Sequence, residues 1–169
     1  GQEVTRLGFF SRFIAVEPTP DLAATCRKRG LEVIESPVEH VSLPDGSVDV
    51  VASFEVIEHL FSPRDFLKQC SRLLRPGGIL LVSCPSIEGF DVMVLREQSM
   101  AVDVEHLNYF HPASLSRLFN SCGFSTLEVQ TPGKLDAELV RNAVLAGERS
   151  LDNDPFLKHV LIERWETLG

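Results

Sequence analysis

A single carboxylate at the end of an apolar run is the most informative feature of this sequence. Glu17 follows Phe13-Ile14-Ala15-Val16, and the next residues signal a helix start, with Thr19 as N-cap and Pro20 as first helical residue. A buried strand that ends in an acid and turns straight into a helix can bind a nucleoside. The carboxylate lies at the C-terminal edge of a parallel sheet, where it can accept hydrogen bonds from both ribose hydroxyls. Glu17 therefore predicts a nucleoside site; the alternative is a solvated acid at a strand end.

Two histidines have the residue type and spacing for proton transfer. His59 lies four residues after Glu55, so one helical turn would place both on the same face. His106 lies two residues before Asn108, in a predicted loop. An imidazole has a pKa near neutrality and could deprotonate an attacking hydroxyl. His59 and His106 are therefore the predicted catalytic residues, and a structural hydrogen-bonding role is the alternative for each.

The elements that must position these residues alternate between strand and helix. Strands are predicted at 13–16, 31–35, 48–52, 79–83 and 124–129, and helices at 20–29, 63–74 and 112–122. This alternation predicts an α/β fold, Rossmann-like, with a mostly parallel sheet and helices on both faces. The β-branched run 48–52 is expected to be a central strand that is buried on both faces. Two further helices, near 135–146 and 154–168, form a helical C-terminal tail.

Composition sets mild limits on function. The chain has 169 residues and a net charge of −8, which argues against bulk binding to a nucleic-acid backbone or an anionic membrane. No apolar run approaches the roughly 20 residues that span a bilayer, and the first residues lack a signal-peptide pattern. A cytoplasmic protein is expected, although a lost targeting segment stays open.

The four cysteines are scattered, with no C-x-x-C pair: Cys26, Cys70, Cys84 and Cys122. Each lies beside apolar neighbours in or near a predicted helix or strand. Reduced thiols in or near the core are therefore expected, and no metal site is predicted.

Five short motifs, in this order, resemble the class I S-adenosylmethionine-dependent methyltransferases. They are Ala-Val-Glu-Pro (15–18), Leu-Pro-Asp-Gly-Ser-Val-Asp-Val-Val (43–51), Glu-Val-Ile-Glu-His-Leu (55–60), Leu-Leu-Arg-Pro-Gly-Gly-Ile-Leu-Leu-Val (73–82) and Cys-Gly-Phe (122–124). The chain is most similar to the branch with the ubiquinone-biosynthesis O-methyltransferases and many small-molecule or glycan methyltransferases. The resemblance implies S-adenosylmethionine as the cofactor and S-adenosylhomocysteine as its product.

Carried over position by position, the resemblance assigns the nucleoside contacts of this cofactor. Glu17, followed by Pro18, is the ribose-binding carboxylate. Pro37, Val38 and Glu39 fall where the family frames the adenine ring, and the Val38 backbone N–H can donate to a ring nitrogen. Many relatives have Asp or Thr where this chain has Pro37. Glu39 could then recognise the adenine amino group, or it could simply be exposed.

The remaining contacts implied by the resemblance follow the fourth strand of the family. Ser53, Phe54 and Glu55 lie there, where the backbone lines the methionine part of the cofactor. Glu55 could hold the cationic amino group, or it could be an acid that the dipole favours at a helix N-terminus. The loop with His106 tends to cover the substrate in this family.

The sequence departs from the family at both ends. The first strand and its glycine-rich loop should precede Glu17 by about twenty residues, and this chain has no such loop. Residues 2–10 fit the helix that normally follows the loop. We therefore expect an N-terminally incomplete methyltransferase-like domain at 1–133, a longer natural protein, and a tail at 134–169 that packs on the domain or on a partner. The final hairpin strand of the family is also missing after Val129.

Three functions agree with these residues. The favoured one is methyl transfer to a small molecule or sugar, with oxygen as the acceptor atom. The second is a catalytically inactive methyltransferase-like binding or scaffolding module. The third, another nucleotide-binding α/β enzyme such as a dehydrogenase, disagrees with the Leu-Arg-Pro-Gly-Gly-Ile stretch (74–79). Neither a nucleic acid nor a membrane is an expected partner, and the tail helices could support a homo-oligomer.

Overall fold

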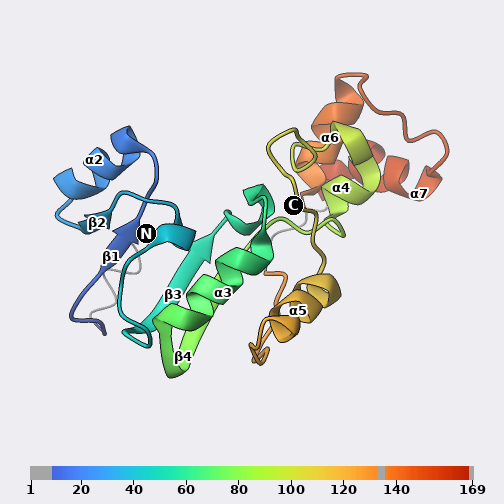
Figure 1. The fold of residues 1–169 in the computed structure, drawn as a ribbon. Coiled ribbons are helices and arrows are strands. Elements are labelled where there is room, and N and C mark those ends of the chain that lie inside the picture. The colour runs from blue at the N-terminus through green and yellow to red at the C-terminus, as the bar shows by residue number, and fades with distance from the viewer. Residues whose placement is uncertain (1–8, 133–135, 168–169) are drawn as a thin grey trace. The chain divides into compact units, whose positions relative to one another are not determined.

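The structure, a computed structural model, describes residues 9–132 and 136–167 (Figure 1). The chain divides into two compact units, Gly1–Val51 with Arg64–Leu80, and Ala52–Pro63 with Leu81–Gly169. The helix expected within residues 2–10 falls almost entirely outside the described part. The domain boundary after residue 133 stays a prediction.

The first unit begins with a parallel strand pair joined by a helix. Strand β1 (Ile14–Val16) pairs with β2 (Glu32–Ile34), and helix α2 (Pro20–Lys28) connects them. The predicted start of this helix is confirmed, because Thr19 is the N-cap residue. Gly30 has a left-handed φ of +79°, which ends the turn after the helix. Parallel strands need such a crossover connection, so the pattern of residues 13–35 determines both the elements and their direction.

A second strand pair is built in the same way. Strand β3 (Val48–Phe54) and strand β4 (Leu74–Ser83) are neighbours in one sheet, with helix α3 (Pro63–Leu73) between them in the chain. Gly78 lies against the Asp49 carbonyl and the Glu55 N–H donates to the Ser83 carbonyl, so both strands run in the same direction. A Cβ atom at Gly78 would lie only 2.9 Å from the Arg75 carbonyl oxygen and 3.1 Å from that of Asp49.

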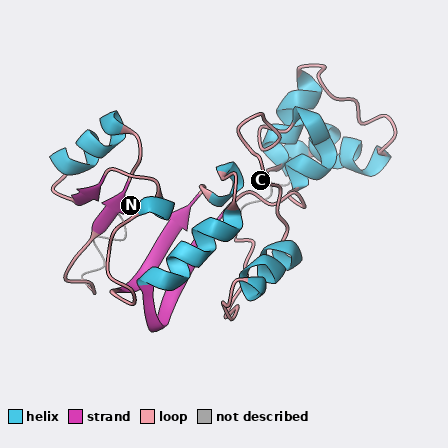
Figure 2. Ribbon diagram, viewed as in Figure 1, coloured by secondary structure: helices cyan, strands magenta, loops and turns pink. Residues whose placement is uncertain are grey.

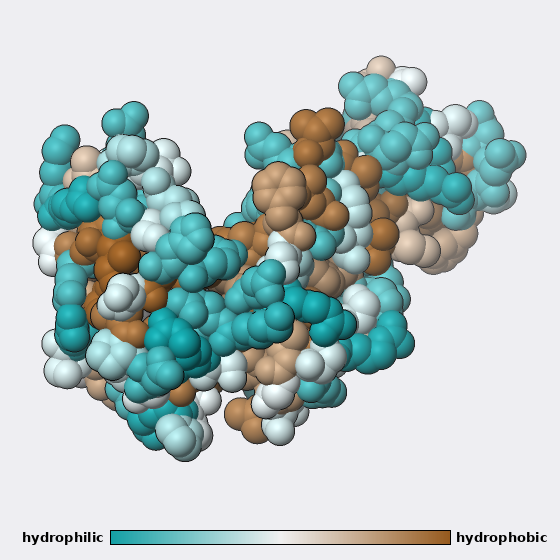
Figure 3. All heavy atoms as spheres, in the orientation of Figure 1, coloured by the Kyte–Doolittle hydropathy of each residue, from teal (hydrophilic) through white to brown (hydrophobic). Residues whose placement is uncertain are grey.

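The described strands form two separate two-stranded sheets (Figure 2). β3 was expected to be buried on both faces, and this is wrong, since Ala52 and Phe54 are exposed and the three valines are only half-buried. The physical reason is that β3 has a single strand neighbour among the described residues, so it is not a central strand. Figure 3 shows apolar residues at the surface, and Ile79 and Leu81 of β4 are 43% and 48% exposed.

The strand predicted at 124–129 is also absent from the described structure. Leu127 is 84% exposed and Val129 is 44% exposed. The alternating pattern is present, but the segment pairs with no strand in the described residues, and an unpaired apolar segment gains no ladder hydrogen bonds.

Helix α3 supplies the core of the first unit. Its buried face consists of Phe66, Leu67, Cys70 and Leu73. On the same helix the Arg72 guanidinium donates to the carbonyls of Val41 at 2.9 Å and Leu43 at 2.8 Å. These hydrogen bonds attach the loop before β3 to α3.

The second unit is mostly helical. Its helices are α4 (Phe90–Leu95), α5 (Pro112–Ser121), α6 (Ala137–Leu145) and α7 (Pro155–Lys158). The sequence predicts α5 and α6 but misses α4. The helix predicted near 154–168 ends at Lys158 and continues as a π-helical turn, His159–Glu163.

The apolar residues of the second unit form one cluster. α4 contributes Leu95, α6 contributes Val140 and Ala143, and Leu151 and Leu161 complete the cluster. α4 therefore packs against α6 inside this unit. No helix in the described ranges is long and apolar enough to cross a membrane, and the four cysteines are free thiols.

We expect Leu67→Ala to lower the free energy of unfolding by about 2–5 kcal/mol, because it leaves a cavity where the side chain is 0% exposed. Urea denaturation followed by circular dichroism measures this. Leu127→Ala is the matched control, and its 84% exposed side chain should change the value by less than about 0.5 kcal/mol. Equal effects of the two variants would contradict the packing of α3.

Candidate functional site

Glu17 lies where the sequence predicts it, directly after β1 and at the start of α2. Its N–H donates to the Ile34 carbonyl at 3.0 Å, so the β1–β2 pairing continues to this residue. Its side chain is half-buried, and Oε1 accepts a hydrogen bond from the Thr19 N–H at 2.8 Å. Helix α2 has no side-chain cap, and the Glu17 carboxylate bonds the backbone of the N-cap residue itself. The carboxylate is therefore held beside a helix N-terminus through Oε1.

The segment expected to frame the adenine follows β2. Pro37 precedes a short 3-10 turn, Val38–His40. Val38 is the first residue of that turn, so the turn itself offers its N–H no carbonyl partner. Glu39 is half-buried, and its charge is one cause of the raised pKa of the Cys70 thiol. Because β1 and β2 are parallel, this segment and Glu17 follow strand ends at the same edge.

Ser53, Phe54 and Glu55 belong to the second unit. Ser53 is buried at the end of β3, whereas Phe54 is 47% exposed. Glu55 has a φ of +53°, an uncommon conformation for a residue with a side chain. Its Oε1 accepts a hydrogen bond of 2.5 Å from the Ser83 hydroxyl. Glu55 therefore joins the ends of β3 and β4 through its side chain, in addition to the backbone bond.

The expectation that Glu55 and His59 share a helix face is wrong. The helical residues here are only Ile57–His59, a single 3-10 turn, and Glu55 lies before it in the left-handed region. A left-handed residue cannot extend a right-handed turn. For the same reason Glu55 is not an acid in the first turn of a helix. Its contact with the cofactor amino group stays a prediction.

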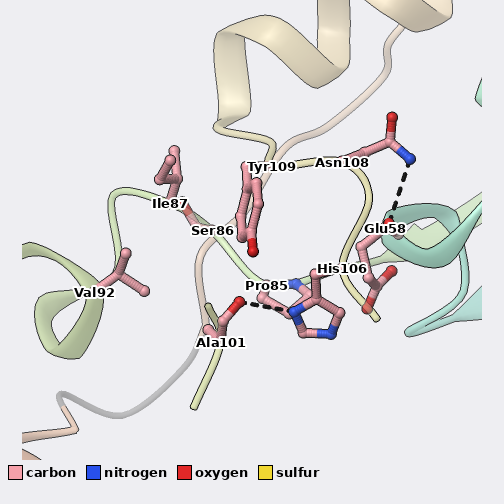
Figure 4. A pocket seen from close by; sticks show the side chains of 9 residues that line it. All are labelled: Glu58, Pro85, Ser86, Ile87, Val92, Ala101, His106, Asn108 and Tyr109. Atoms are coloured by element: carbon pink, nitrogen blue, oxygen red, sulfur yellow. Dashed lines mark hydrogen bonds between the residues drawn. The ribbon is translucent and has the colours of Figure 1, made fainter. Parts of the chain in front are cut away.

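The structure brings the two predicted catalytic histidines together. The ring centroids of His59 and His106 are 4.7 Å apart. His59 Nδ1 lies 3.0 Å from the Glu105 carbonyl. His106 Nδ1 lies 2.7 Å from the Ala101 carbonyl, as Figure 4 shows. A carbonyl only accepts hydrogen bonds, so each Nδ1 carries the proton and donates it. In the neutral form of each ring, Nε2 then carries the lone pair.

Glu58 is the residue that sequence reasoning missed. It is only 2% exposed, and neither carboxylate oxygen has a hydrogen-bond partner in the described structure. His59 Nε2 is 4.0 Å from Glu58 Oε1, too far for a hydrogen bond. Burial raises the pKa of Glu58. In the sequence Glu58 lies between Ile57 and His59, and nothing in that local pattern predicts that its side chain is buried.

Asn108 attaches the loop of His106 to the turn that carries Glu58 and His59. Its backbone N–H donates to the Glu58 carbonyl at 2.9 Å. Its side-chain amide donates to the Leu60 carbonyl at 2.6 Å and reaches the Glu58 carbonyl at 3.3 Å. These hydrogen bonds join two segments far apart in the sequence, which is why the two histidines meet.

A small pocket lies beside this cluster. Figure 4 shows its lining, which includes Glu58, His106, Asn108 and Tyr109. Its volume is about 10 Å³, close to the smallest cavity that holds one water molecule. The space next to the histidines therefore fits a water molecule or a single ion in this structure.

Thus the predicted site residues fall into two groups. Glu17 and Pro18 lie with residues 37–39 in the first unit, and Ser53–Glu55 lie with the two histidines in the second. The structure brings the two histidines into contact, and it places Glu17 and residues 37–39 after the ends of neighbouring parallel strands. Their roles in binding or catalysis stay predictions.

Comparison with known proteins gives the same class as the motifs. A family described as a methyltransferase domain matches residues 1–82. A probable S-adenosylmethionine-dependent methyltransferase of Mycolicibacterium smegmatis is 35% identical over 123 residues, which is 62% of this chain and 46% of the relative. A ubiquinone biosynthesis O-methyltransferase of Caulobacter vibrioides is 39% identical over 87 residues, 48% of this chain and 34% of the relative. The chain thus spans less than half the length of these curated relatives.

A solved structure agrees with this. The crystal structure of an S-adenosylmethionine-dependent methyltransferase of Thermotoga maritima, described as a possible histamine N-methyltransferase, matches with a TM-score of 0.60 at 29% identity. The match covers 67% of this chain and 55% of that protein. The predicted resemblance and the Rossmann-like α/β fold are confirmed.

The cysteine thiols allow a test of burial and charge next to the site. Burial, followed by the charges of Glu58 and Glu55, raises the pKa of Cys84 to about 11, and burial raises that of Cys70 to about 12. Below these values a raised pKa leaves less thiolate, the form that reacts. At pH 7.5 we expect iodoacetamide to alkylate Cys84 about 100-fold and Cys70 about 1,000-fold more slowly than in the unfolded chain. Peptide mass spectrometry of native and urea-unfolded protein measures both rates; equal rates for Cys84 would contradict its environment.

Proposed function

We propose that this chain transfers a methyl group from S-adenosylmethionine to an oxygen atom of a small-molecule or sugar acceptor. Residues 1–82 match the methyltransferase domain family, and the chain has the fold of class I S-adenosylmethionine-dependent methyltransferases. The observation that carries this proposal is the position of Glu17. Its carboxylate follows the parallel strand β1, lies at the start of α2 and is oriented by the Thr19 N–H.

The chemistry of the residues in the first unit fits an adenosine group. Glu17 Oε1 is engaged by Thr19, and Oε2 can accept a hydrogen bond from a ribose hydroxyl. The Val38 N–H begins a 3-10 turn and can donate to a ring nitrogen, while the half-buried Glu39 can accept from an amino group. These groups supply both donors and acceptors, as a nucleoside requires.

In the second unit the end of β3 fits the charged end of the cofactor. Glu55 keeps one oxygen on the Ser83 hydroxyl, so its carboxylate has a fixed direction. Its second oxygen can accept from an ammonium group. When bound, S-adenosylmethionine supplies a methyl group that its sulfonium already activates for displacement. The protein then has to hold an acceptor in line, exclude water and remove a proton if the acceptor carries one.

Oxygen is the acceptor atom that the histidine pair supports. A neutral amine attacks with its own lone pair, whereas a hydroxyl has to lose its proton to become a good nucleophile. His59 packs against His106, which lines a small pocket, and in the neutral form of each ring Nε2 carries the lone pair, so we assign them to activating the acceptor hydroxyl. The Caulobacter relative is named as an O-methyltransferase, which supports the same atom, although the Thermotoga protein is described as a possible N-methyltransferase.

A small acceptor agrees with the charge of the chain. The net charge of −8 disfavours a nucleic-acid acceptor, whose phosphates would be repelled. The inactive binding or scaffolding module is the alternative function, and cofactor binding followed by turnover distinguishes the two.

Glu17→Ala should weaken binding of S-adenosylhomocysteine about 10- to 100-fold, because hydrogen bonds to a charged group contribute about 1.5–3 kcal/mol. Isothermal titration calorimetry measures the dissociation constant. Glu17→Gln keeps an oxygen for the Thr19 N–H and should lose less affinity.

Glu32→Ala is the matched control for this measurement. Glu32 is an exposed acid at the opposite end of β2, where it pairs with Arg12, so its removal should leave the affinity unchanged. If the folded wild-type chain binds no S-adenosylhomocysteine, the alternative of an inactive module is favoured. If Glu17→Ala and Glu32→Ala behave alike, the role of Glu17 is wrong.

His106→Gln should lower kcat at least about 100-fold, as expected for loss of a group that activates the nucleophile. S-adenosylhomocysteine formation with a panel of hydroxylated small molecules and sugars measures turnover. Affinity for S-adenosylhomocysteine should stay unchanged. His40→Gln, an exposed histidine in the first unit, is the control, and full activity of His106→Gln would exclude this residue from the reaction.

A further inference from the structure

The carboxylate of Glu58 is buried without a side-chain hydrogen-bond donor. It is 2% exposed, and both oxygens lack a hydrogen-bond donor in the described residues. Burying an unpaired carboxylate is costly, so such groups are usually paired with a cation or bound to a metal. The neighbours of Glu58 in the turn are Ile57, which is apolar, and His59, whose Nε2 lies 4.0 Å from Glu58 Oε1, beyond hydrogen-bond distance.

The two histidine rings lie beside Glu58. One ligand atom each of Glu58, His59 and His106 lies within 4.8 Å of the others. Both Nδ1 atoms donate to backbone carbonyls, which fixes the tautomer and leaves Nε2 as a lone-pair donor. Metal-binding histidines in proteins are oriented by this kind of second hydrogen bond.

From this geometry we propose that Glu58, His59 and His106 bind one divalent transition-metal cation. Two imidazole nitrogens and one carboxylate oxygen suit Mn²⁺, Fe²⁺, Co²⁺, Ni²⁺ or Zn²⁺, whereas Mg²⁺ and Ca²⁺ prefer oxygen ligands alone. Metal–ligand bonds of about 2.1 Å place neighbouring ligand atoms roughly 3.0–3.4 Å apart. Binding therefore draws these side chains inward. The adjoining pocket of about 10 Å³ has room for one small occupant.

The scaffold around the three ligands restricts their movement. Asn108 attaches the loop of His106 to the turn of Glu58, and the Glu105 carbonyl holds His59. Asp103 accepts hydrogen bonds from the N–H groups of Glu105 and His106, so the loop is also fixed from within. The two segments thus form a frame that exists before the metal binds.

A protonated histidine is the competing explanation. His59 Nε2 lies 4.0 Å from Glu58 Oε1, so an imidazolium there would balance the charge without making a hydrogen bond. It would leave the second carboxylate oxygen and His106 Nε2 without a role. The metal satisfies all three groups at once, which is why we favour it over the expectation that the chain binds no metal.

A bound metal would also activate the acceptor hydroxyl, an inference that rests on the proposed function. Three protein ligands leave coordination positions open. An acceptor hydroxyl at one of them would have a lowered pKa, because the metal would stabilise the alkoxide. The proton would pass to solvent water, since both imidazoles would be ligands.

Cobalt titration of the full chain tests the site directly. The protein is treated with a chelator, dialysed and titrated with Co²⁺ alone, while its visible absorption bands are recorded. We expect saturation at about one Co²⁺ per chain, and displacement of the bands by Zn²⁺. Glu58→Gln, His59→Gln and His106→Gln should each weaken binding at least tenfold, as loss of a ligand requires. His40→Gln, an exposed histidine elsewhere, should bind as the wild type does.

S-adenosylhomocysteine affinity, measured on the same samples, separates this proposal from the proposed function. Circular dichroism establishes that each variant is folded. Absence of cobalt bands in the wild type, or equal binding by the three ligand variants and His40→Gln, would overturn the metal site. Cobalt binding in a chain that binds no S-adenosylhomocysteine would support the metal site and contradict the methyltransferase activity. Glu17→Ala should leave cobalt binding unchanged.

Discussion

In a parallel pair of strands the carboxyl ends meet at one edge, and most candidate residues of this chain follow such an end. Glu17 comes after β1 and residues 37–39 come after β2, whose pairing is parallel. Glu55 and Ser83 stand at the ends of β3 and β4 and are hydrogen-bonded to each other. The direction of the strands, set by helices α2 and α3 between them, therefore decides which side chains become neighbours. Glu17 and Glu55 thus lie at the last hydrogen bond of each ladder.

The backbone at Glu55 adopts an unfavourable conformation that its hydrogen bonds to Ser83 hold in place. A residue with a side chain in the left-handed region costs about 1–3 kcal/mol, and Glu55 occupies it with a φ of +53°. The two hydrogen bonds to Ser83 offset part of that cost. The turn at Ile57 then starts in a direction that brings Glu58 inward. Local strain and the burial of a charge thus occur within four residues, a combination that is common at functional sites.

The sequence was sufficient where the signals are local. Helices α2, α3 and α5 each begin with Pro and are followed closely by Gly, so their bounds could be predicted to within a residue or two. Helix α4 has only six residues and Gly89 as its N-cap, which is too little for a periodic pattern. The strand at 124–129 failed for a different reason, because a strand needs a partner and its own residues do not reveal whether one is present.

The same distinction holds at the site. The position of Glu17 could be predicted, since a strand, an acid and a helix start are adjacent in the chain. The burial of Glu58 could not, because it depends on the loop near His106 folding over the turn, a contact made by residues about 50 positions away. The residue type alone predicts a role in proton transfer for His59 and His106. Their contact with each other depends on Asn108 and could not be predicted.

Gly78 has a consequence for how such chains are recognised. Its backbone lies so close to the carbonyls of Arg75 and Asp49 that any side chain would collide with two oxygen atoms. The Arg-Pro-Gly-Gly motif therefore indicates that two strands lie close together, and it does not indicate a catalytic activity. A descendant that had lost every catalytic group would still have to keep this glycine, so the motif identifies an architecture, and only the side chains at the strand ends can identify a reaction.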